Sequence, residues 1–260
     1  MPLLDNEKGS LSIVGIGPGS RDQMTVRALK VLAGAEIIIG NDTYLEQLKP
    51  LLIGKQVIRS SMGKEVERAQ VAIKLANTHN VAIVSGGDAG VYGMASIVLE
   101  VLERSDIDIP IQVIPGITAA NAAASRVGSP LSGDFAVISL SDLLTPIEII
   151  EKRLEAIFSI GIPVVLYNPK SRGRPHNFSK AMTIARKYLS NATPIALVKN
   201  AYREDEKIMI TTLGEIERYD NSIDMHTTVI IGGIETRTWR KGTDVKGIIT
   251  PRGYHQKYVY

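Results

Sequence analysis

The amino-acid sequence predicts an α/β protein of two lobes with mostly parallel sheets. Short apolar runs alternate along the chain with stretches of helical periodicity, which is typical of βαβ units. Several runs are apolar throughout, as expected of strands covered on both faces. These runs indicate about ten strands, which is many for one open sheet, so two lobes are the simpler arrangement.

The first part of the chain supplies strands and helices in turn. Strands are expected at LSIVGI (11–16), EIIIG (36–40), VAIVS (81–85) and IQVIPG (111–116). Helices are expected at TVRALKVLAGA (25–35), with Gly34 as its C-cap, and at EVERAQVAIKLA (65–76). In the second helix, four apolar residues share one face: Val66, Ala69, Ile73 and Ala76.

The second part repeats the alternation. Strands are expected at FAVIS (135–139), PVVLYNP (163–169), PIALVKN (194–200) and TTVIIGG (227–233), and EKIMITTLGEI (206–216) suggests one more strand and a short helix. Pro115–Gly116 breaks the chain before an Ala-rich helix that starts at Thr118. We therefore expect lobes at 10–115 and 116–236, followed by a basic tail, 237–260, that forms a loop or an extended arm.

Composition excludes several classes of protein. The 260 residues include no cysteine, so disulfides, thiolate-bound zinc and cysteine-bound iron–sulfur clusters are ruled out. The four histidines show no metal-ligand spacing. The start, MPLLDNEKGS, is unlike a signal peptide, and no apolar run approaches a membrane span. We therefore expect a soluble, cytoplasmic protein without a membrane partner.

Charge is unevenly distributed. The net charge is +3, but residues 237–260 carry six Lys/Arg and one Asp, which is +5, so the remainder is −2. The tail is either a contact for anions or a solvated terminus. The body of the chain is not basic enough to predict a nucleic-acid partner.

A glycine-rich loop follows one expected strand. In GGDAGVYG, four glycines surround Asp88: Gly86, Gly87, Gly90 and Gly93. Glycine has no Cβ, so it lets the backbone approach a ligand and take positive φ. The loop indicates a ligand site at the carboxyl end of a parallel strand, and the alternative is a simple strand-to-helix turn.

A second glycine-rich stretch, GIGPGS (15–20), follows the first strand. It approaches a dinucleotide fingerprint, with Asp42 at a suitable distance for a ribose contact, but Ser20 replaces the last glycine. Pro18 also removes an amide that a phosphate cradle would use. A nicotinamide oxidoreductase is therefore disfavoured, and a tight turn or another kind of ligand loop remains.

Polar residues follow two strands of the second lobe. In ISLSDLLTPIEIIEKRL, Thr145 and Pro146 read as an N-cap and first helical residue, with Glu148 completing a capping box. Capping leaves three residues unexplained: Ser139, Ser141 and Asp142. In LYNPKSRGRPHN, Asn168–Pro169 precede three cations, Lys170, Arg172 and Arg174, which form either a solvated loop or a grip on carboxylates.

Six segments in order resemble the tetrapyrrole methylase family: IVGIGPGS, GGDAGVYG, PGITAANAAA, LYNP, LVKNAYRE and TTVIIGG. They extend from Ile13 to about Thr236. The resemblance implies the family's fold of two α/β lobes with a ligand cleft between them. It also implies S-adenosylmethionine as methyl donor, S-adenosylhomocysteine as product, no protein-bound metal, a tetrapyrrole as small-molecule partner, and a homodimer.

The resemblance also implies site residues. Cofactor contacts would be Pro18, Gly86, Gly87, Asp88, Val91, Tyr92, Gly93, Thr118, Ala119, Asn168, Ala201 and Thr228. Three of these depart from the family pattern: Asn168 stands for a common Met, Ala201 for Gly and Thr228 for Ala. Pro18 and Gly19 would belong to the loop that faces the tetrapyrrole.

Within the family, FAVISLSDLLTPIEIIEKRL and ITPRGYHQKY resemble members that methylate C17 of a corrin precursor and contract its ring in cobalamin biosynthesis. A sulfonium carries its own leaving group, so methyl transfer needs alignment but no protein nucleophile. Ring contraction needs proton transfers, which we assign to a polar group with Asp88 as second candidate: Ser139, Ser141, Asp142 and Thr145. Arg172, Arg174 and the tail would hold substrate carboxylates.

Other interpretations stay open. The substrate is either metal-free or contains cobalt, which would then belong to the substrate. The chain could act on a different corrin precursor, or bind a tetrapyrrole or nucleotide without turnover. An RNA-modifying methylase of the same fold is disfavoured by the −2 charge of the body.

Overall fold

The computed structural model describes residues 9–259, which divide into two compact units, Met1–Ala119 and Ala120–Tyr260. The division falls at Ala119, near the expected break at Pro115–Gly116. Residues 1–8, which carry most of the stretch judged unlike a signal peptide, lie outside the described part. Within residues 9–259, no helix is both long and apolar enough to cross a membrane.

The first unit contains a five-stranded sheet in the order β3-β2-β4-β1-β5. All of its pairings are parallel, as predicted. The strands are β1 (Ser10–Gly15), β2 (Ile37–Asn41), β3 (Gln56–Ser60), β4 (Asn80–Ser85) and β5 (Ile111–Ile114). Their carboxyl ends therefore meet at one edge, where the two glycine-rich stretches emerge.

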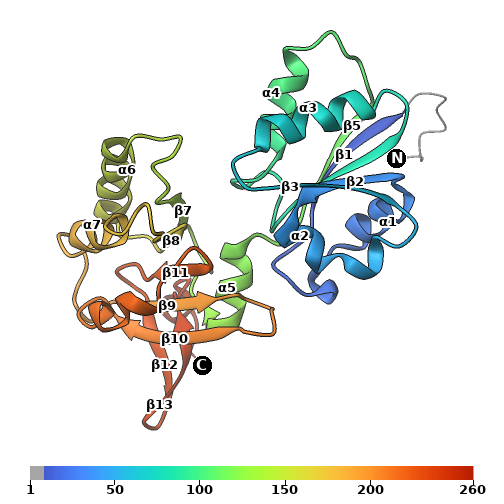
Figure 1. Ribbon diagram of the computed structural model, residues 1–260. Helices are drawn as coiled ribbons and strands as arrows, with labels where there is room; N and C mark the ends of the chain where they lie inside the picture. The colour runs from blue at the N-terminus through green and yellow to red at the C-terminus, as the bar shows by residue number, and fades with distance from the viewer. Residues whose placement is uncertain (1–8, 260) are drawn as a thin grey trace. The chain divides into compact units, whose positions relative to one another are not determined.

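Helices cover both faces of this sheet (Figure 1). They are α1 (Val26–Gly34) and α2 (Asp42–Gln47) on one face, and α3 (Glu65–Leu75) and α4 (Ala95–Glu103) on the other. Because side chains alternate along a strand, Ile13 packs toward α3 and α4 while Val14 packs toward α1 and α2. Burial on both faces explains why the inner strands β2 and β4 are largely apolar, whereas the edge strand β3 carries Gln56 and Arg59.

Two helix details differ from expectation. The C-cap of α1 is Ala35, and Gly34 is the last helical residue. On α3, Ala69 and Ile73 are buried, but Val66 is 51% exposed. Val66 lies in the first turn of α3, outside the part of the helix that contacts the sheet cluster.

The second unit contains a sheet in the order β10-β9-β11-β8-β7. Its strands are β7 (Ala136–Ser139), β8 (Val164–Tyr167), β9 (Pro194–Lys199), β10 (Lys207–Thr212) and β11 (Thr227–Ile231). Only β7 and β8 pair in parallel, and the other three pairings are antiparallel. The mostly parallel arrangement expected of both lobes thus holds for the first alone. The connection from β9 to β10, residues 200–206, is too short for a crossover helix, so β10 runs antiparallel to β9. After a longer connection, β11 enters on the other side of β9 and runs antiparallel to both β9 and β8.

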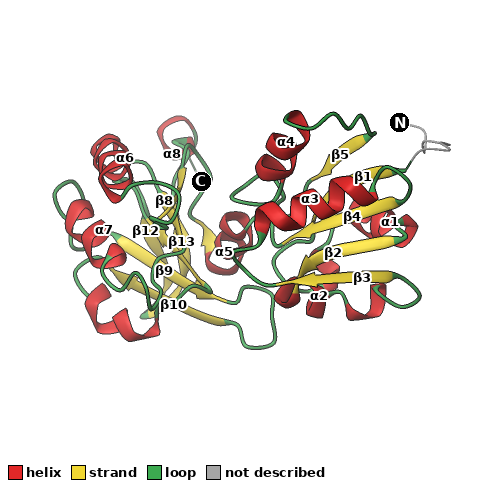
Figure 2. Ribbon diagram, turned by 45° about the horizontal axis from the view of Figure 1, so that its top comes forward, coloured by secondary structure: helices red, strands yellow, loops and turns green. Residues whose placement is uncertain are grey.

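The two faces of the second sheet are also covered. Helices α6 (Ile147–Ile160) and α7 (Asn177–Ala185) pack on one face together with a 3₁₀ turn, Ile216–Ser222. Helix α5 (Ala119–Val127) packs on the other face, which Figure 2 shows. Short alanines along α5 let it lie close to the strands.

The predicted N-cap at Thr145 is wrong. Helix α6 starts at Ile147, and Pro146 occupies the N-cap position without any side-chain cap hydrogen bond. Pro146 has ψ of 141°, which is extended backbone and therefore outside the first turn. Its carbonyl oxygen accepts hydrogen bonds from the N–H groups of Ile149 and Ile150 instead.

The basic tail is not a loop or an extended arm. It forms an antiparallel hairpin of β12 (Arg237–Lys241) and β13 (Asp244–Ile249), and then a short helix, α8 (Tyr254–Lys257). Strand β13 pairs in parallel with β6 (Gly128–Ser129), directly after α5. A bulge between Trp239 and Arg240 breaks the strand period, which explains why the sequence showed none.

The hairpin is an integral part of the second unit, because Ile248 is 1% exposed and packs beside α5. We predict that Ile248→Ala lowers the free energy of unfolding by about 2–5 kcal/mol, through lost burial and the cavity left behind. Val245→Ala is the matched control, since Val245 on the same strand is 39% exposed and its truncation should cost under about 1 kcal/mol. Urea unfolding measures both, and equal small losses would show that the hairpin does not contribute to the core.

Candidate functional site

The two glycine-rich stretches of the first unit are joined by a pair of backbone hydrogen bonds. The Gly17 N–H donates to the Gly87 carbonyl oxygen at 3.0 Å, and the Gly87 N–H donates to the Gly17 carbonyl oxygen at 2.9 Å. Both residues have positive φ, +76° and +66°, which glycine adopts without strain. The loops after β1 and β4 therefore form one structure.

Asp88 connects this structure to the loop after β5. Its Oδ1 accepts from the Gly90 N–H at 2.7 Å, and its Oδ2 accepts from the Gly116 N–H at 2.9 Å. Hydrogen bonds to a charged acceptor are about twice as strong as neutral ones. The carboxylate thus holds the loop conformation, whereas its predicted role in proton transfer stays a prediction.

The three loops are packed too closely for side chains. A Cβ on Gly116 would lie 2.1 Å from the Gly87 carbonyl oxygen, and a Cβ on Gly15 would lie 2.7 Å from the Gly116 nitrogen. A Cβ on Gly93 would lie 2.5 Å from the carbonyl oxygen of Ala89. Gly15 and Gly116 were not among the predicted site residues, although Gly15 begins the stretch GIGPGS and Gly116 belongs to the break at Pro115–Gly116.

The structure brings Gly87 close to the predicted Thr118–Ala119 pair. A Cβ on Gly87 would lie 3.7 Å from Thr118 Cα and 3.8 Å from the Ala119 nitrogen, where α5 begins. Around them, Gly86, Val91 and Gly93 are partly buried and Tyr92 is exposed with φ of +51°. Pro18 is buried, and Gly19 is partly exposed.

In the second unit, the predicted residues share one edge of the sheet. Strand β11 is antiparallel to both β8 and β9, so its amino end lies beside their carboxyl ends, and β7 is parallel to β8. This topology places four predicted residues along that edge: Ser139, Asn168, Ala201 and Thr228. Thr228 is 8% exposed, and Asn168 has φ of +52°, which asparagine tolerates better than most residues.

A chain of hydrogen bonds joins most of the predicted proton-transfer group. Ser139 Oγ accepts from Asn168 Nδ2 at 3.0 Å and from the Ser141 N–H at 3.2 Å. Ser141 Oγ accepts from Arg174 Nη1 at 2.7 Å, and Arg174 Nε lies 3.8 Å from Asp142 Oδ1. Thr145 lies outside this chain of contacts.

The predicted cations have different environments. Arg174 is committed to the loop after β7, because its side chain is 15% exposed and also reaches Met225 Sδ at 3.2 Å. Lys170 forms an ion pair with Asp220. Arg172 is exposed, and so it is the more accessible of the two predicted carboxylate-binding arginines.

The connection between β9 and β10 is clamped by Glu206. Its carboxylate accepts from Arg126 Nη2 at 2.8 Å and from the Tyr202 N–H at 2.7 Å. Burial opposes the charge, but these hydrogen bonds hold the pKa of Glu206 below its usual value, and the hydrogen bond to Glu206 raises the pKa of Arg126. The clamp fixes a strained segment that includes Ala201, since Tyr202 has φ of +61°.

Side chains that could bind a metal ion are not clustered in the described part of the chain. Among residues 9–259, no group of three or more His, Cys, Asp or Glu side chains is placed to hold a metal ion.

Comparison with known proteins identifies the family. The sequence profile of Tetrapyrrole (Corrin/Porphyrin) Methylases matches residues 10–217. The chain belongs to this methylase family. The family and the α/β fold expected from the sequence are therefore confirmed, and the family is one of methyltransferases.

Individual relatives agree with this assignment. The methylase is 45% identical over 245 residues to a probable cobalt-factor III C(17)-methyltransferase of Salmonella typhimurium, covering 94% of this chain and 99% of that protein. It is 43% identical to the cobalamin biosynthesis protein CbiHC of Archaeoglobus fulgidus over 98% of this chain, but it spans only 55% of that longer relative. The crystal structure of the methyltransferase CobJ superposes with a TM-score of 0.87 at 33% identity, covering 94% of this chain and all of that one.

Sequence reasoning missed two further residues of the methylase. Tyr167, at the end of β8, accepts a hydrogen bond from the Ala120 N–H at 2.6 Å and so anchors the first turn of α5. Glu206 clamps the segment after β9. Neither residue shows a signal in the local sequence. Tyr167 binds Ala120, which is distant in the sequence, and Glu206 binds the distant Arg126 and the strained backbone at Tyr202.

We predict that Gly116→Ala lowers the free energy of unfolding by about 1–3 kcal/mol, because a methyl group would collide with the Gly87 carbonyl oxygen. Gly34→Ala is the control, since nothing lies within 4 Å of its Cβ position. That change should leave stability unchanged or raise it by up to about 1 kcal/mol. Thermal and urea unfolding compare the two, and a Gly116 variant as stable as the Gly34 variant would contradict the close packing.

We predict that Glu206→Gln lowers the free energy of unfolding by about 1 kcal/mol at neutral pH. This figure allows for solvent screening, because the Arg126 side chain is 39% exposed. The lowered pKa of Glu206 means that its contribution is present above the unfolded-state pKa and is lost as pH falls through the folded-state pKa. The stability gap between wild type and variant should therefore close on acidification from about pH 5 downward. Urea unfolding across this range tests it, with exposed Glu235→Gln as control. A stability difference between wild type and Glu206→Gln that stays constant across this pH range would refute the stabilising role of the Glu206 carboxylate.

Proposed function

We propose that this methylase transfers a methyl group from S-adenosylmethionine to C17 of a corrin precursor and contracts the ring in cobalamin biosynthesis. The near full-length similarity to the Salmonella typhimurium cobalt-factor III C(17)-methyltransferase carries the proposal. It makes cobalt-factor III the first substrate to test, with metal-free precorrin-3B second. Any cobalt enters with the substrate.

The loops of the first unit suit S-adenosylmethionine. Their glycines have no side chain between the backbone and a ligand, and Gly87 lies beside the hydroxyl-bearing Thr118 and the start of α5. When bound, the cofactor supplies an electrophilic methyl group with its own leaving group. Gly86, Gly87 and Thr118 would hold it, and the contacts expected from the resemblance at Asn168, Ala201 and Thr228 belong to the same proposal.

The chain itself contributes to methyl transfer by positioning the reactants. Rigid loops that orient the reactants can lower the activation barrier by roughly 7–11 kcal/mol in favourable cases. The reciprocal Gly17–Gly87 bonds and the Asp88 clamp provide such rigidity without any side-chain nucleophile.

Ring contraction requires a group that moves protons, and Asp142 is the best placed. Its carboxylate, 36% exposed, lies beside Arg174, which also donates to the Ser141 hydroxyl. The Asp142 carboxylate can accept or donate a proton, while Arg174 lies beside it and holds Ser141 in place. Arg172, which is exposed, would hold a substrate carboxylate.

The first test is anaerobic incubation of the purified protein with methyl-labelled S-adenosylmethionine and cobalt-factor III, with precorrin-3B in parallel. We expect a gain of one methyl group and a ring-contracted absorbance spectrum with one of them. Cofactor binding without S-adenosylhomocysteine formation would indicate a binding protein. Release of S-adenosylhomocysteine with a different corrin precursor would move the proposal to another member of the family.

In the same assay, Asp142→Asn should lower the rate of ring contraction at least about 100-fold, the usual contribution of a general acid or base. Its affinity for S-adenosylmethionine should stay within about twofold. Thr145→Ala is the control, because Thr145 lies outside the hydrogen-bonded group, and it should retain most activity. An Asp142 variant with full ring contraction would remove the assignment.

We propose that the enzyme is cytoplasmic, as expected from the sequence, and a homodimer, as the family resemblance implies. Light scattering of the full chain in solution gives its oligomeric state, and a monomer would contradict the second part.

A further inference from the structure

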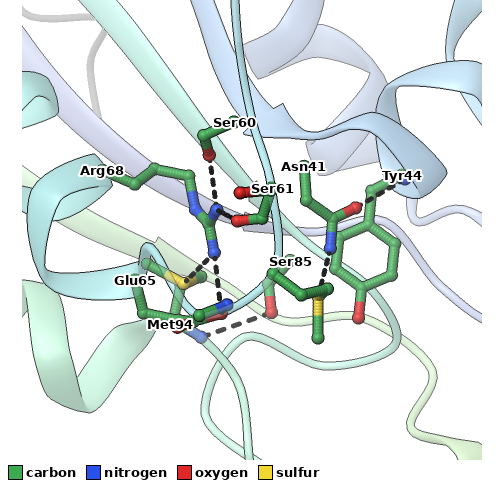
Figure 3. Close-up of polar contacts among 10 residues, drawn as sticks. Asn41, Tyr44, Ser60, Ser61, Glu65, Arg68, Ser85 and Met94 are labelled. Carbon is green, nitrogen blue, oxygen red and sulfur yellow. Dashed lines mark hydrogen bonds and ion pairs between the residues drawn. The ribbon is translucent and has the colours of Figure 1, made fainter.

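One arginine of the first unit is almost fully buried. Arg68 of α3 is 4% exposed and lies close to the ends of β3 and β4 (Figure 3). Its Nη1 donates to Ser60 Oγ at 2.5 Å and to the Ser61 carbonyl oxygen at 3.2 Å. The guanidinium therefore links α3 to the carboxyl end of β3.

The charge of Arg68 is only weakly compensated. The carboxylate that pairs with it, Glu65, lies 3.4 Å from Nη2 and is itself 38% exposed. The Nε atom is buried without a hydrogen-bond partner. Burying a charged group costs several kcal/mol unless it is well paired, and an apolar side chain of similar volume would avoid that cost. The guanidinium is therefore a poor choice for stability alone.

The remaining contact of Arg68 is with the glycine-rich loop. Its Nη2 lies 3.5 Å from Met94 Sδ, and the Met94 N–H donates to Ser85 Oγ at 3.3 Å. Ser85 ends β4 and Met94 directly precedes α4, so these two residues are the two ends of loop 86–93. Arg68 thus touches the loop at the point where it closes.

A second side chain holds the start of the same loop. A Cβ on Gly86 would lie 2.4 Å from the ring of Tyr44, so the ring packs directly on this glycine. Tyr44 is fixed in turn because its N–H donates to Asn41 Oδ1 at 3.0 Å, at the start of α2. Loop 86–93 is therefore held at one end from β2 and at the other, through Arg68, from β3.

We propose that Arg68 is a positioning residue for methyl transfer, which fixes the binding conformation of loop 86–93 through Met94 without touching cofactor or tetrapyrrole. The proposal rests on the proposed function only in naming the ligand of the loop. When a side chain that holds a loop is lost, the binding-competent fraction falls and the apparent Kd rises by the same factor. A competent fraction reduced to about one tenth would raise the Kd about tenfold.

The experiment compares Arg68→Met with Ile73→Val, a change at a residue of the same helix that is 2% exposed and outside the loop contacts. Titration calorimetry gives the Kd for S-adenosylmethionine, hydrogen exchange gives the protection of residues 86–94, and urea unfolding gives global stability. We expect Arg68→Met to match or exceed wild-type stability, raise the Kd about tenfold and speed exchange in the loop. Ile73→Val should unfold at a lower urea concentration than wild type, because a buried methyl group is lost, and its Kd should be unchanged.

Arg68→Lys provides the conservative variant. It keeps the charge but loses the fork that spans Ser60 and Met94, so its Kd and exchange rates should fall between those of wild type and Arg68→Met. If Arg68→Met fails to fold, the lysine variant carries the comparison. Unchanged loop exchange and a Kd within about twofold in the folded variants would overturn the proposal.

The experiment distinguishes a failure of the proposed function from a failure of the positioning role of Arg68. If the wild type binds no S-adenosylmethionine, the proposed function fails, while faster loop exchange in the free Arg68 variant would still support the positioning role. If the wild type methylates its substrate but the loop exchange and Kd are insensitive to Arg68, the function stands and the positioning role falls.

Discussion

The reciprocal hydrogen bonds between Gly17 and Gly87 are the constraint on which the proposed binding surface of the first unit depends. They bring two loops together backbone to backbone, with positive φ on both sides, which glycine adopts without strain. Gly116 enters the same contact and is held there by Asp88. A parallel sheet makes this possible, because it delivers the ends of β1, β4 and β5 to one edge. The ligand loop is therefore rigid because of backbone contacts, and its side chains are secondary.

The second unit reaches a comparable result by another route. Its sheet is mostly antiparallel, and β11 presents its amino end where β8 and β9 present their carboxyl ends. Residues from opposite strand directions, Asn168 and Thr228 among them, thus share an edge. Here side chains supply the order: Asn168 and Ser141 both bond to Ser139, and Glu206 ties down the segment after β9. A methylase that must bind a cofactor and also move protons would need both kinds of surface.

Local patterns in the sequence were enough for most elements and for the glycine loops. Apolar runs predicted every strand of the two five-stranded sheets except β3, whose sequence QVIRS is too polar to form such a run. GGDAGVYG indicated a ligand loop because a cluster of glycines is visible in the sequence itself. The direction of β11, the hairpin in the tail and the binding partners of Asp88 and Arg174 could not be predicted, since each depends on residues far apart in the chain. The N-cap prediction at Thr145 was wrong because Pro146 has extended backbone, so the helix starts one residue later than expected.

The arginines show how much charge placement depends on three-dimensional context. Arg126 meets Glu206 in a two-pronged contact near the surface, where the pair is well matched and solvent lowers its cost. Arg174 is less exposed and divides its donors between a serine, an aspartate and a thioether. Arg68 is almost fully buried, its one ion pair is with the partly exposed Glu65, and it links the end of β3 to Met94, which follows the glycine loop. In this order the arginine side chain becomes less exposed, while each arginine still connects separate segments of the chain. At a buried position such as that of Arg68, the planar guanidinium sets the distances between the segments that it contacts. A hydrophobic side chain could fill the same volume, but it could not fix the positions of these segments by directional hydrogen bonds.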